Sequence, residues 1–470
     1  MSASHRQNRN LAPLDVIELQ NQGLVGNSNE TDTHRLHKRR LNRSSDEENR
    51  NIPLNIPLQS EAAEDAFVTI PKQLISLATL EYIGFSRMKA SQVWDTWTNW
   101  PLDGPRRETD PDDGSLEMTF IHFITGIFDT STDTCSNNDA DWISCMQSFG
   151  LSQELQLAIV DPVFKYLRLS DSCSAWAKDT VQMRFAGLEL IRSASLEREK
   201  SLQCASGRSG GSHGATSGPS RSQSRSASGI QRASSSNVSI STLTSASAVA
   251  ARNAPGFTTL YKGIDQARIE GLLGEDGKLK DVQTLLSNPP SDFSGRGAMF
   301  YFTPNFEVAQ YYAAYAKRRA GSESVVIITI AIPNRVIQAM DAPELQRIYW
   351  SSPEWKELVW SSRNQNNLRG SLRRFRKATL IIGTIARKPN LSYHRLDSWE
   401  QISEDYVFKV DGANGQACAI QFVFTGEEEG DDFLKEHLSD RTKVFLFTRT
   451  EVDAWVAQNQ NAFAWMSSRQ

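Results

Sequence analysis

The chain has 470 residues, of which 39% are hydrophobic and 23% charged, and its formal net charge is -4 at pH 7. This length exceeds one ordinary hydrophobic core and fits two domains with room for disordered segments. The small negative charge supplies no overall field toward nucleic acid or an anionic membrane, so such binding would need a local patch.

The cysteines are odd in number and scattered, without a CxxC pair: Cys135, Cys145, Cys173, Cys204 and Cys418. This pattern is typical of a reducing compartment and has no zinc-ligand spacing, so we expect no metal site. The N-terminus lacks the apolar core of a secretory signal, and no apolar run reaches the roughly 18 residues of a spanning helix. We therefore expect an intracellular protein, cytoplasmic or nuclear, with no membrane contact.

Residues 1–66 are rich in Asn, Arg, Glu and Ser and carry almost no periodic apolar signal, which predicts a disordered tail. Lys38, Arg39 and Arg40 form a basic run within it. This run is either a weak nuclear-import signal or, as is more common, an ordinary solvated stretch.

Residues 67–200 show the spacing of amphipathic helices. Phe120, Phe123, Ile124, Ile127 and Phe128 recur at i, i+3, i+4, i+7 and i+8, which places them on one helix face. Similar stripes follow, so we expect an all-α helical domain, a bundle of about five or six helices. Its tryptophans either fill the core or, where exposed, bind a protein partner, whose identity the sequence leaves unknown.

Residues 201–255 are dominated by Ser, Gly, Ala and Arg. Such a segment buries too little surface to offset its conformational entropy, so we expect a disordered linker. It is either a passive tether or a substrate for basophilic kinases at the serines near Arg221, Arg225 and Arg232.

From residue 256 to residue 470 the pattern changes to strands and short helices. The strand-like segments are Thr258–Lys262, Phe300–Phe302, Val325–Ile332, Ala378–Ile385, Ala417–Phe424 and Val444–Phe447, and the helical ones are Phe306–Arg318 and Ser352–Ser361. Val325–Ile332 and Ala378–Ile385 are nearly continuous apolar runs, which predicts central strands covered on both faces. The sequence therefore predicts an α+β C-terminal domain.

Three short motifs stand out in this domain. Leu260-Tyr261-Lys262-Gly263 ends the first strand, Phe300-Tyr301-Phe302-Thr303-Pro304 leads into a helix, and Ala419-Ile420-Gln421-Phe422-Val423-Phe424 forms a late strand. Tyr312 on the helix lies eleven positions after Tyr301.

In order and spacing these motifs resemble the ADP-ribosyltransferase superfamily, in its poly(ADP-ribose) polymerase-like branch with a His-Tyr-Glu triad. The resemblance covers the chain from about Phe257 onward. It implies a split-sheet α+β fold whose cleft grips NAD, the substrate that donates ADP-ribose. The domain order is also similar to that of proteins from filamentous fungi.

The resemblance implies a role for each matching residue. Tyr261 and Gly263 would form the strand end that meets the nicotinamide, since a glycine lets the backbone approach and hydrogen-bond the carboxamide. Tyr312 would stack on the nicotinamide ring, and Tyr301 would wall the pocket. Thr303, with a proline after it, would cap the helix that presents Tyr312.

Two triad positions depart from the family. Lys262 replaces His, and its ammonium is a point charge that would donate to a ribose hydroxyl or a pyrophosphate oxygen. Gln421 replaces Glu, and losing a carboxylate opposite the positive ribose of the transition state costs about 3–4 kcal/mol. Ala309 also stands where a Ser is common in the family. Other candidate carboxylates are Glu404, Glu427 and Glu428.

Each of these residues also has an ordinary structural explanation. Tyr312 belongs to an apolar helix stripe and is either a stacking residue or part of the core. Lys262 is either a triad residue or a solvated lysine at a strand end. Gln421 lies either in the cleft or on an exposed strand face.

A basic cluster precedes the second central strand: Arg369, Arg373, Arg374, Arg376 and Lys377. It binds the diphosphate of a dinucleotide, an acidic partner or RNA, or it is simply a solvated face, which is the more common case. The cluster lacks the interleaved aromatic residues of a single-strand binding surface, so nucleic acid is not the favoured partner.

These patterns support three hypotheses. The first is a divergent NAD-dependent mono-ADP-ribosyltransferase that modifies an unknown acceptor, with Lys262, Tyr312 and Gln421 as catalytic residues. The second is a catalytically inactive binding module of the same fold. The third is a two-domain interaction scaffold.

Overall fold

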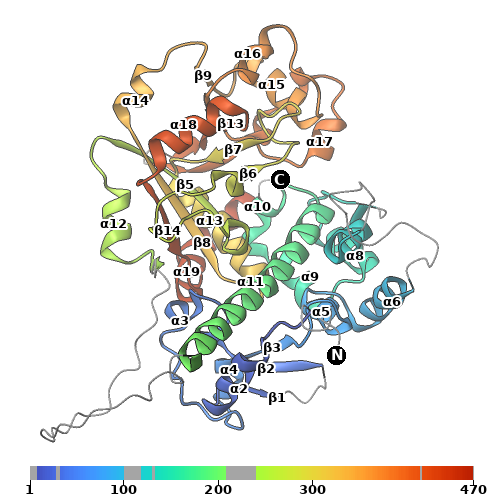
Figure 1. The fold of residues 1–470 in the computed structure, drawn as a ribbon. Coiled ribbons are helices and arrows are strands. Elements are labelled where there is room, and N and C mark those ends of the chain that lie inside the picture. The colour runs from blue at the N-terminus through green and yellow to red at the C-terminus, as the bar shows by residue number, and fades with distance from the viewer. Residues whose placement is uncertain are drawn as a thin grey trace, which may run out of the picture.

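The computed structural model describes residues 8–27, 32–99, 118–129, 133–207, 240–412 and 415–468. It is a mixed α/β protein, with a largely helical N-terminal part before residue 208 and an α/β C-terminal part from residue 240. Figure 1 shows the long helix α11 (Cys173–Gly207) crossing the molecule diagonally, with the N-terminal elements along one side and the C-terminal sheets along the other.

The N-terminal helices begin where the sequence offers side-chain caps. Ser76, Ser86, Thr119, Asn138 and Ser152 each accept a hydrogen bond from a backbone N–H of the following helix, which satisfies a donor that the first turn leaves unpaired. The helices are α2 (Pro13–Asn21), α3 (Ser45–Glu48), α4 (Ala63–Ala66), α5 (Leu77–Tyr82), α6 (Arg87–Thr98), α7 (Phe120–Thr125), α8 (Asp139–Phe149), α9 (Gln153–Ile159) and α10 (Lys165–Arg168). Short 3₁₀ turns include η1 (Lys38–Arg40), η2 (Gly126–Asp129) and η3 (Pro162–Phe164).

The N-terminal part is largely helical, as expected, but it also contains a small sheet, and one of its three strands lies within residues 67–200, which were expected to be all-α. Strands β1 (Val25–Asn27), β2 (Thr33–His37) and β3 (Phe67–Pro71) pair in antiparallel order. β2 is rich in His and Arg, and a short polar strand of this kind gives no apolar alternation for the sequence pattern to detect.

The disordered tail expected over residues 1–66 is likewise wrong for its described residues. Leu19 on α2 is buried, and the carboxylate of Asp15 forms an ion pair with Arg198 of α11 at 2.8 Å. Asp15 also accepts a hydrogen bond from Ser195 of the same helix. The buried apolar residues of this segment are isolated in the sequence and do not form a periodic stripe. Polar contacts between residues far apart in the sequence, such as Asp15 and Arg198, fix the segment in place.

The expectation of a disordered linker over residues 201–255 is wrong at both ends of that range. α11 continues through Gly207, and β4 (Ser241–Thr242) and α12 (Ala246–Arg252) follow residue 240, while residues 208–239 lie outside the described chain. Ser245 caps α12, and the alanines within it favour a helix. The Ser- and Ala-rich composition therefore concealed a good helix sequence.

The C-terminal part is built on two sheets that are joined by one short backbone contact. One has the strand order β4-β14-β8-β5 and the other β6-β7-β13-β10-β9, and a two-stranded ribbon, β11-β12, stands apart. The backbones of Tyr261 and Thr303 join the two sheets through N–H···O bonds of 2.8 and 3.0 Å. The strands are β5 (Phe257–Asp265), β6 (Leu286–Ser287), β7 (Met299–Phe302), β8 (Val325–Pro333), β9 (Leu345–Ile348), β10 (Leu380–Thr384), β11 (Lys409–Gly412), β12 (Gly415–Cys418), β13 (Ile420–Thr425) and β14 (Thr442–Leu446).

Every predicted strand overlaps an observed one. β8 and β10 are inner strands and are buried along nearly their whole length, as their continuous apolar sequences predict. The helices are α13 (Phe306–Arg319), α14 (Asn334–Ala339), α15 (Pro353–Arg363), α16 (Arg373–Arg376), α17 (Asn390–His394), α18 (Glu428–Leu438) and α19 (Arg449–Ser468). α13 packs against β5 and β8, and this contact positions most of the predicted site.

The two parts of the molecule share a hydrophobic core. The ring of Phe164 on η3 stacks on Tyr315 of α13 at 5.1 Å and on Trp455 of α19 at 5.8 Å, centroid to centroid. The buried Tyr315 hydroxyl donates to the carbonyl of Ile159 at 3.0 Å. Aromatic stacking and a satisfied buried hydroxyl therefore fix the helical part against the α/β part.

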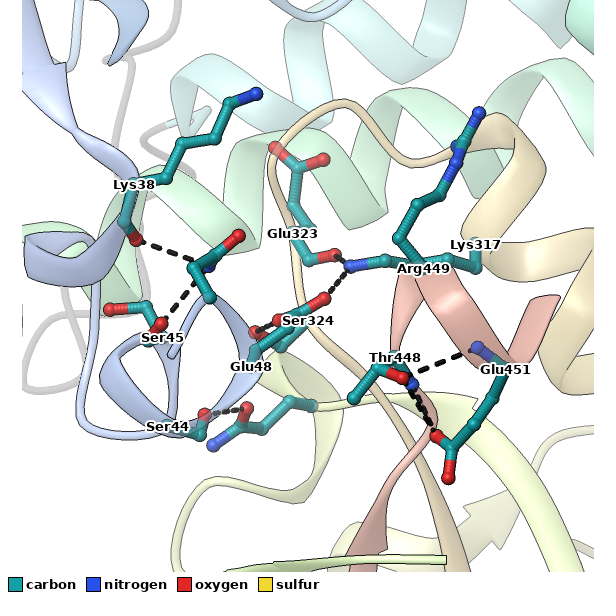
Figure 2. A network of polar contacts seen from close by, with 12 residues as sticks. Lys38, Ser44, Ser45, Glu48, Lys317, Glu323, Ser324, Thr448, Arg449 and Glu451 are labelled. Carbon is teal, nitrogen blue, oxygen red and sulfur yellow. Dashed lines mark hydrogen bonds and ion pairs between the residues drawn. The ribbon is translucent and has the colours of Figure 1, made fainter. Parts of the chain in front are cut away.

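A buried polar contact adds to this interface. Figure 2 shows Glu48 of α3 between Lys317 of α13 and Ser324, which precedes β8. The ion pair joins Glu48 to Lys317, whose side chains are each 7% exposed, and Ser324 Oγ donates to Glu48 at 2.6 Å. Burial and the nearby Arg449 lower the pKa of Lys38, which lies in the same region.

Candidate functional site

Three neighbouring strands carry the predicted site residues. Lys262 and Gly263 lie on β5, Tyr301 on β7 and Gln421 on β13. β7 pairs directly with β13, and the contact between Tyr261 and Thr303 attaches β5 to the residue that follows β7. The fold therefore places the three motifs on neighbouring strands, but their side chains do not all meet, because Lys262 is bonded to Leu285 and Ser287 whereas Gln421 is bonded to Asp292.

Lys262 is held by the protein itself. Its ammonium donates to the carbonyl of Leu285 at 2.8 Å and to the hydroxyl of Ser287 at 3.2 Å. Burial lowers the pKa of Lys262 to about 8, and the charge of Arg268 acts in the same direction. The residue is thus not a freely solvated lysine at a strand end, because it is only partly exposed and its ammonium is hydrogen-bonded to the chain.

Gly263 has a packing explanation. A Cβ atom at this position would lie 2.2 Å from the carbonyl oxygen of Ala309 and 2.9 Å from the amide nitrogen of Ala313. Both atoms belong to the backbone of α13, which cannot yield as a flexible side chain would. The glycine therefore allows α13 to pack closely on β5.

Tyr261 and Thr303 stabilise the contact between the two sheets. The buried ring of Tyr261 packs edge-on against Phe306 at 5.0 Å. Thr303 Oγ1 donates to the carbonyl of Ile420 at 2.8 Å and accepts from the N–H of Asn305 at 3.1 Å.

Thr303 is not the cap of the following helix, contrary to the expectation. α13 begins at Phe306, with Asn305 at the N-cap position and no side-chain capping bond. The Asn305 side chain instead accepts a hydrogen bond from the N–H of Ile420 at 3.1 Å. Both polar side chains at this helix start are therefore used to fix β13.

Tyr301 anchors the loop before β7. Its hydroxyl lies 2.6 Å from Ser291 Oγ and accepts a hydrogen bond from the N–H of Phe293 at 3.4 Å. Burial raises the pKa of Tyr301 above its usual range, so this hydroxyl stays protonated. The anchored loop places Asp292, which lies between these two partners, beside β13.

Gln421 faces the interior and contacts this Asp292. The amide of Gln421 donates to Asp292 Oδ2 at 2.8 Å, and the side chains are 5% and 3% exposed, respectively. The backbone N–H of Ala386 donates to the same oxygen at 2.7 Å. Arg363 of α15 donates to the other carboxylate oxygen, at 2.9 Å through Nε and 2.5 Å through Nη2.

Tyr312 joins this cluster from α13. Its ring stacks on Phe408 at 6.4 Å, centroid to centroid, and the side chains of Ser170 and Asp171 lie near its hydroxyl. Burial raises the pKa of Tyr312 to about 12, and the negative charge of Asp292 acts in the same direction. Burial also raises the pKa of Asp171 to about 6. The turn after α10 of the helical part therefore reaches the predicted site.

Asp292 and Arg363 were missed by the sequence analysis. The carboxylate beside Gln421 is Asp292, whereas the expected Glu404 and Glu427 form ion pairs with Lys409 and Arg376 in more exposed positions. Asp292 lies in a loop rich in Pro, Ser and Gly, where no periodicity indicates burial. The only sequence features that could have indicated an ordered loop here were the two prolines before Asp292 and the strand motif after it.

Two surface hollows are lined by other residues. One, of about 260 Å³, adjoins the loop of Ser294 to Gly297, and the other, of about 300 Å³, lies near Gln22 and Leu54. Within the described residues, His, Cys, Asp and Glu side chains nowhere gather in threes as a metal site requires. In the same residues, none of the helices has the length and apolar surface needed to cross a membrane.

Comparison with protein-family models, with curated proteins and with solved structures finds no match for this chain.

Proposed function

We propose that the C-terminal part is a divergent ADP-ribosyltransferase-like module with a closed cleft, and that the protein acts as an interaction scaffold instead of a transferase. The split arrangement of two sheets supports the first half of this proposal, because it sets the Lys262, Tyr301 and Gln421 strands side by side. The spacing of Tyr301 and Tyr312, on a strand and the helix after it, supports it as well.

One observation carries the second half: the reactive groups of the predicted site are already engaged within the chain. The ammonium of Lys262 is bonded to Leu285 and Ser287, and the amide of Gln421 is bonded to Asp292. A buried polar group that exchanges an internal partner for a ligand gains little net free energy. NAD binding would therefore require these contacts to open first.

The charge balance of the site also argues against transferase activity. A transferase stabilises the positive ribose of its transition state with an uncompensated carboxylate. Here the carboxylate of Asp292 is neutralised by Arg363 at 2.5 Å, and both groups are largely buried. A neutral pair presents little net charge to the ribose.

The test is a calorimetric titration of the full chain with NAD at millimolar concentration. We expect no saturable binding, and no NAD cleavage after Gln421→Glu. Binding that is lost in Tyr312→Ala but kept in the control Tyr349→Ala, whose ring is 41% exposed, would contradict the closed cleft.

A second candidate function is mono-ADP-ribosyl transfer from NAD to an acceptor, and the position of Asp292 favours it. This carboxylate lies next to Gln421, where the family has Glu, so it would supply the missing negative charge if Arg363 moved away. Under this function Tyr301 and Tyr312 line the nicotinamide pocket, and Lys262 contacts the ribose or the pyrophosphate.

Mass spectrometry of the chain incubated with NAD tests this candidate. If Asp292 acts on the ribose, Asp292→Asn lowers modification by about 10²–10³-fold. The double variant Asp292→Asn, Arg363→Met keeps the site neutral and controls for unfolding. Equal modification in all forms, or none in the unaltered chain, would exclude the transferase.

As a scaffold, the protein would bind a protein partner through its helical part. Trp97 and Trp142 are buried there and serve the core, so they do not form the partner surface. Met88 on α6 is 74% exposed and is the most exposed large apolar side chain of the described residues. Crosslinking at this helix is the direct way to test for a partner.

A further inference from the structure

The hollow of about 260 Å³ in the C-terminal part has the features of a ligand site that is separate from the proposed cleft. It lies between the loop after Asp292, the turn before α16 and the start of α18. Its lining includes Ser294, Gly295, Arg296, Gly297, Arg376 and Glu427. The volume is below the roughly 300–1,000 Å³ of sites for drug-sized ligands, so it suits a small ligand or a single charged group.

The loop that forms one wall is fixed before any ligand binds. The N–H of Gly295 donates to Ser362 Oγ at 3.0 Å, and the N–H of Gly297 donates to the carbonyl of Ser294 at 2.9 Å. Gly295 has a φ of +55°, which a residue with a side chain adopts only with strain. A preformed wall lowers the ordering cost of binding.

Gly297 has no such structural requirement. A Cβ atom there would meet only the Ser294 carbonyl oxygen, at an ordinary contact distance of 3.6 Å. The fold therefore tolerates a side chain at this position in the lining of the hollow.

Two of the three charged residues that line the hollow, Arg296 and Arg376, are positive. Arg296 is oriented by a bond from its Nε to the carbonyl of Gln365 at 2.9 Å, which leaves the outer nitrogens of the guanidinium for a ligand. Arg376 faces the hollow from α16. Arg369, Arg373 and Lys377 lie exposed on the same short segment.

One acidic residue, Glu427, also lines the hollow. It pairs with Arg376 at 3.4 Å, and the two side chains are 54% and 67% exposed. An exposed pair of this kind contributes little to stability, so an anion with more negative charge displaces the carboxylate at small cost.

We propose that this hollow binds the phosphate group of a small phosphorylated ligand, with Arg296 and Arg376 as its two main contacts. A guanidinium offers paired donors that match phosphate oxygens, and such charge-assisted bonds are stronger than neutral ones. The proposal does not depend on NAD binding in the cleft, because no residue assigned to the cleft lines the hollow.

The test is calorimetry of the full chain with inorganic pyrophosphate and inorganic phosphate at constant ionic strength. We expect pyrophosphate to bind at one site. Arg296→Ala and Arg376→Ala should each weaken binding by about tenfold or more, as loss of one charge-assisted contact predicts. Glu427→Gln should strengthen binding, since it removes the competing carboxylate.

Two further variants separate a site from general surface attraction. Gly297→Leu fills the hollow without changing charge and should abolish binding while thermal unfolding shows that the fold persists. Arg374→Ala removes a cation that pairs with Glu354 at 2.6 Å outside the lining, and should leave binding unchanged. No pyrophosphate binding, or equal loss in the Arg296, Arg376 and Arg374 variants, would overturn the proposal.

Discussion

At the scale of single residues, Gly263 makes the clearest prediction. Gly263→Ala places a Cβ atom against the backbone of α13 and should destabilise the fold by about 1–3 kcal/mol through overpacking. Gly126→Ala is the matched control, because a Cβ there meets nothing within 4 Å and its backbone is helical. Denaturant unfolding should show the control within about 1 kcal/mol of the unaltered protein. Similar losses in both variants would disprove the packing explanation.

Lys262 makes a prediction about pH. Burial lowers the pKa of Lys262 from its usual 10.5 to about 8 in the folded protein. Below about pH 8 the lysine is charged in both states, and the cost of burying the charge is fully present. Between pH 8 and 10.5 the unfolded chain binds more protons, so the free energy of unfolding rises, by as much as about 1.4 kcal/mol per pH unit.

This rise is measured by denaturant unfolding across the alkaline range in the unaltered chain and in Lys262→Met. The variant should lack this contribution to the slope, whereas Lys280→Met, which removes an exposed lysine, should keep it. If the free energy of unfolding changed with pH in the same way in all three proteins, the pKa of Lys262 would not be lowered in the folded protein.

Single residues also differ in whether the sequence alone could predict their role. The strand-like run Phe300–Phe302 and the helical pattern Phe306–Arg318 correctly predicted a strand followed by a helix, because these patterns are local properties of the sequence. The pairing of Asp292 with Arg363 spans 71 positions, and nothing near either residue indicates its partner. Buried ion pairs depend on tertiary contacts, so this part of the site could only come from the structure.

At the scale of elements, α3 attaches the first residues of the chain to the C-terminal part. Glu48→Gln should leave the buried Lys317 without its counter-charge and destabilise the fold by about 3–5 kcal/mol. Glu47→Gln is the control, since Glu47 pairs with Arg50, whose side chain is 74% exposed, and such a pair contributes about 0–1 kcal/mol.

The readout is the free energy of unfolding together with amide hydrogen exchange of β2. Exchange should accelerate in β2 of the Glu48 variant before the rest of the chain is affected. Unchanged stability would mean that Glu48 and Lys317 are solvated, which contradicts the contact in Figure 2.

Elements were predicted best where burial is continuous. β8 and β10 appear in the sequence as apolar runs because both faces of each strand are covered. α2 and β2 escaped detection because only isolated residues such as Leu19 and Leu36 enter the core. A composition rich in polar residues is therefore compatible both with a surface helix or strand and with a disordered segment.

At the scale of the whole molecule, the shared aromatic core makes the two parts one unit. A protease site introduced between residues 208 and 239 should yield two fragments that remain associated after cleavage. Phe164→Ala removes the ring that stacks on Tyr315 and Trp455 and should weaken this association by about 3–5 kcal/mol.

Analytical ultracentrifugation of the cleaved protein measures the association. Phe128→Ala is the control, because this buried ring belongs to the core of the helical part and should leave the fragments together. Fragments that separate without any substitution would show that the linker, and not the shared core, holds the two parts.

The strand order has a consequence for synthesis on the ribosome. β14 pairs with both β4 and β8, and Trp455 of α19 stacks on Phe164. In the chain, however, β14 and α19 come long after β8, because strands β9, β10 and β13 of the second sheet lie between them. While the ribosome is still making them, the edge of β8 and the aromatic face of the helical part remain uncovered. Exposed strand edges and apolar faces invite aggregation, so the nascent chain should depend on chaperones until β14 emerges.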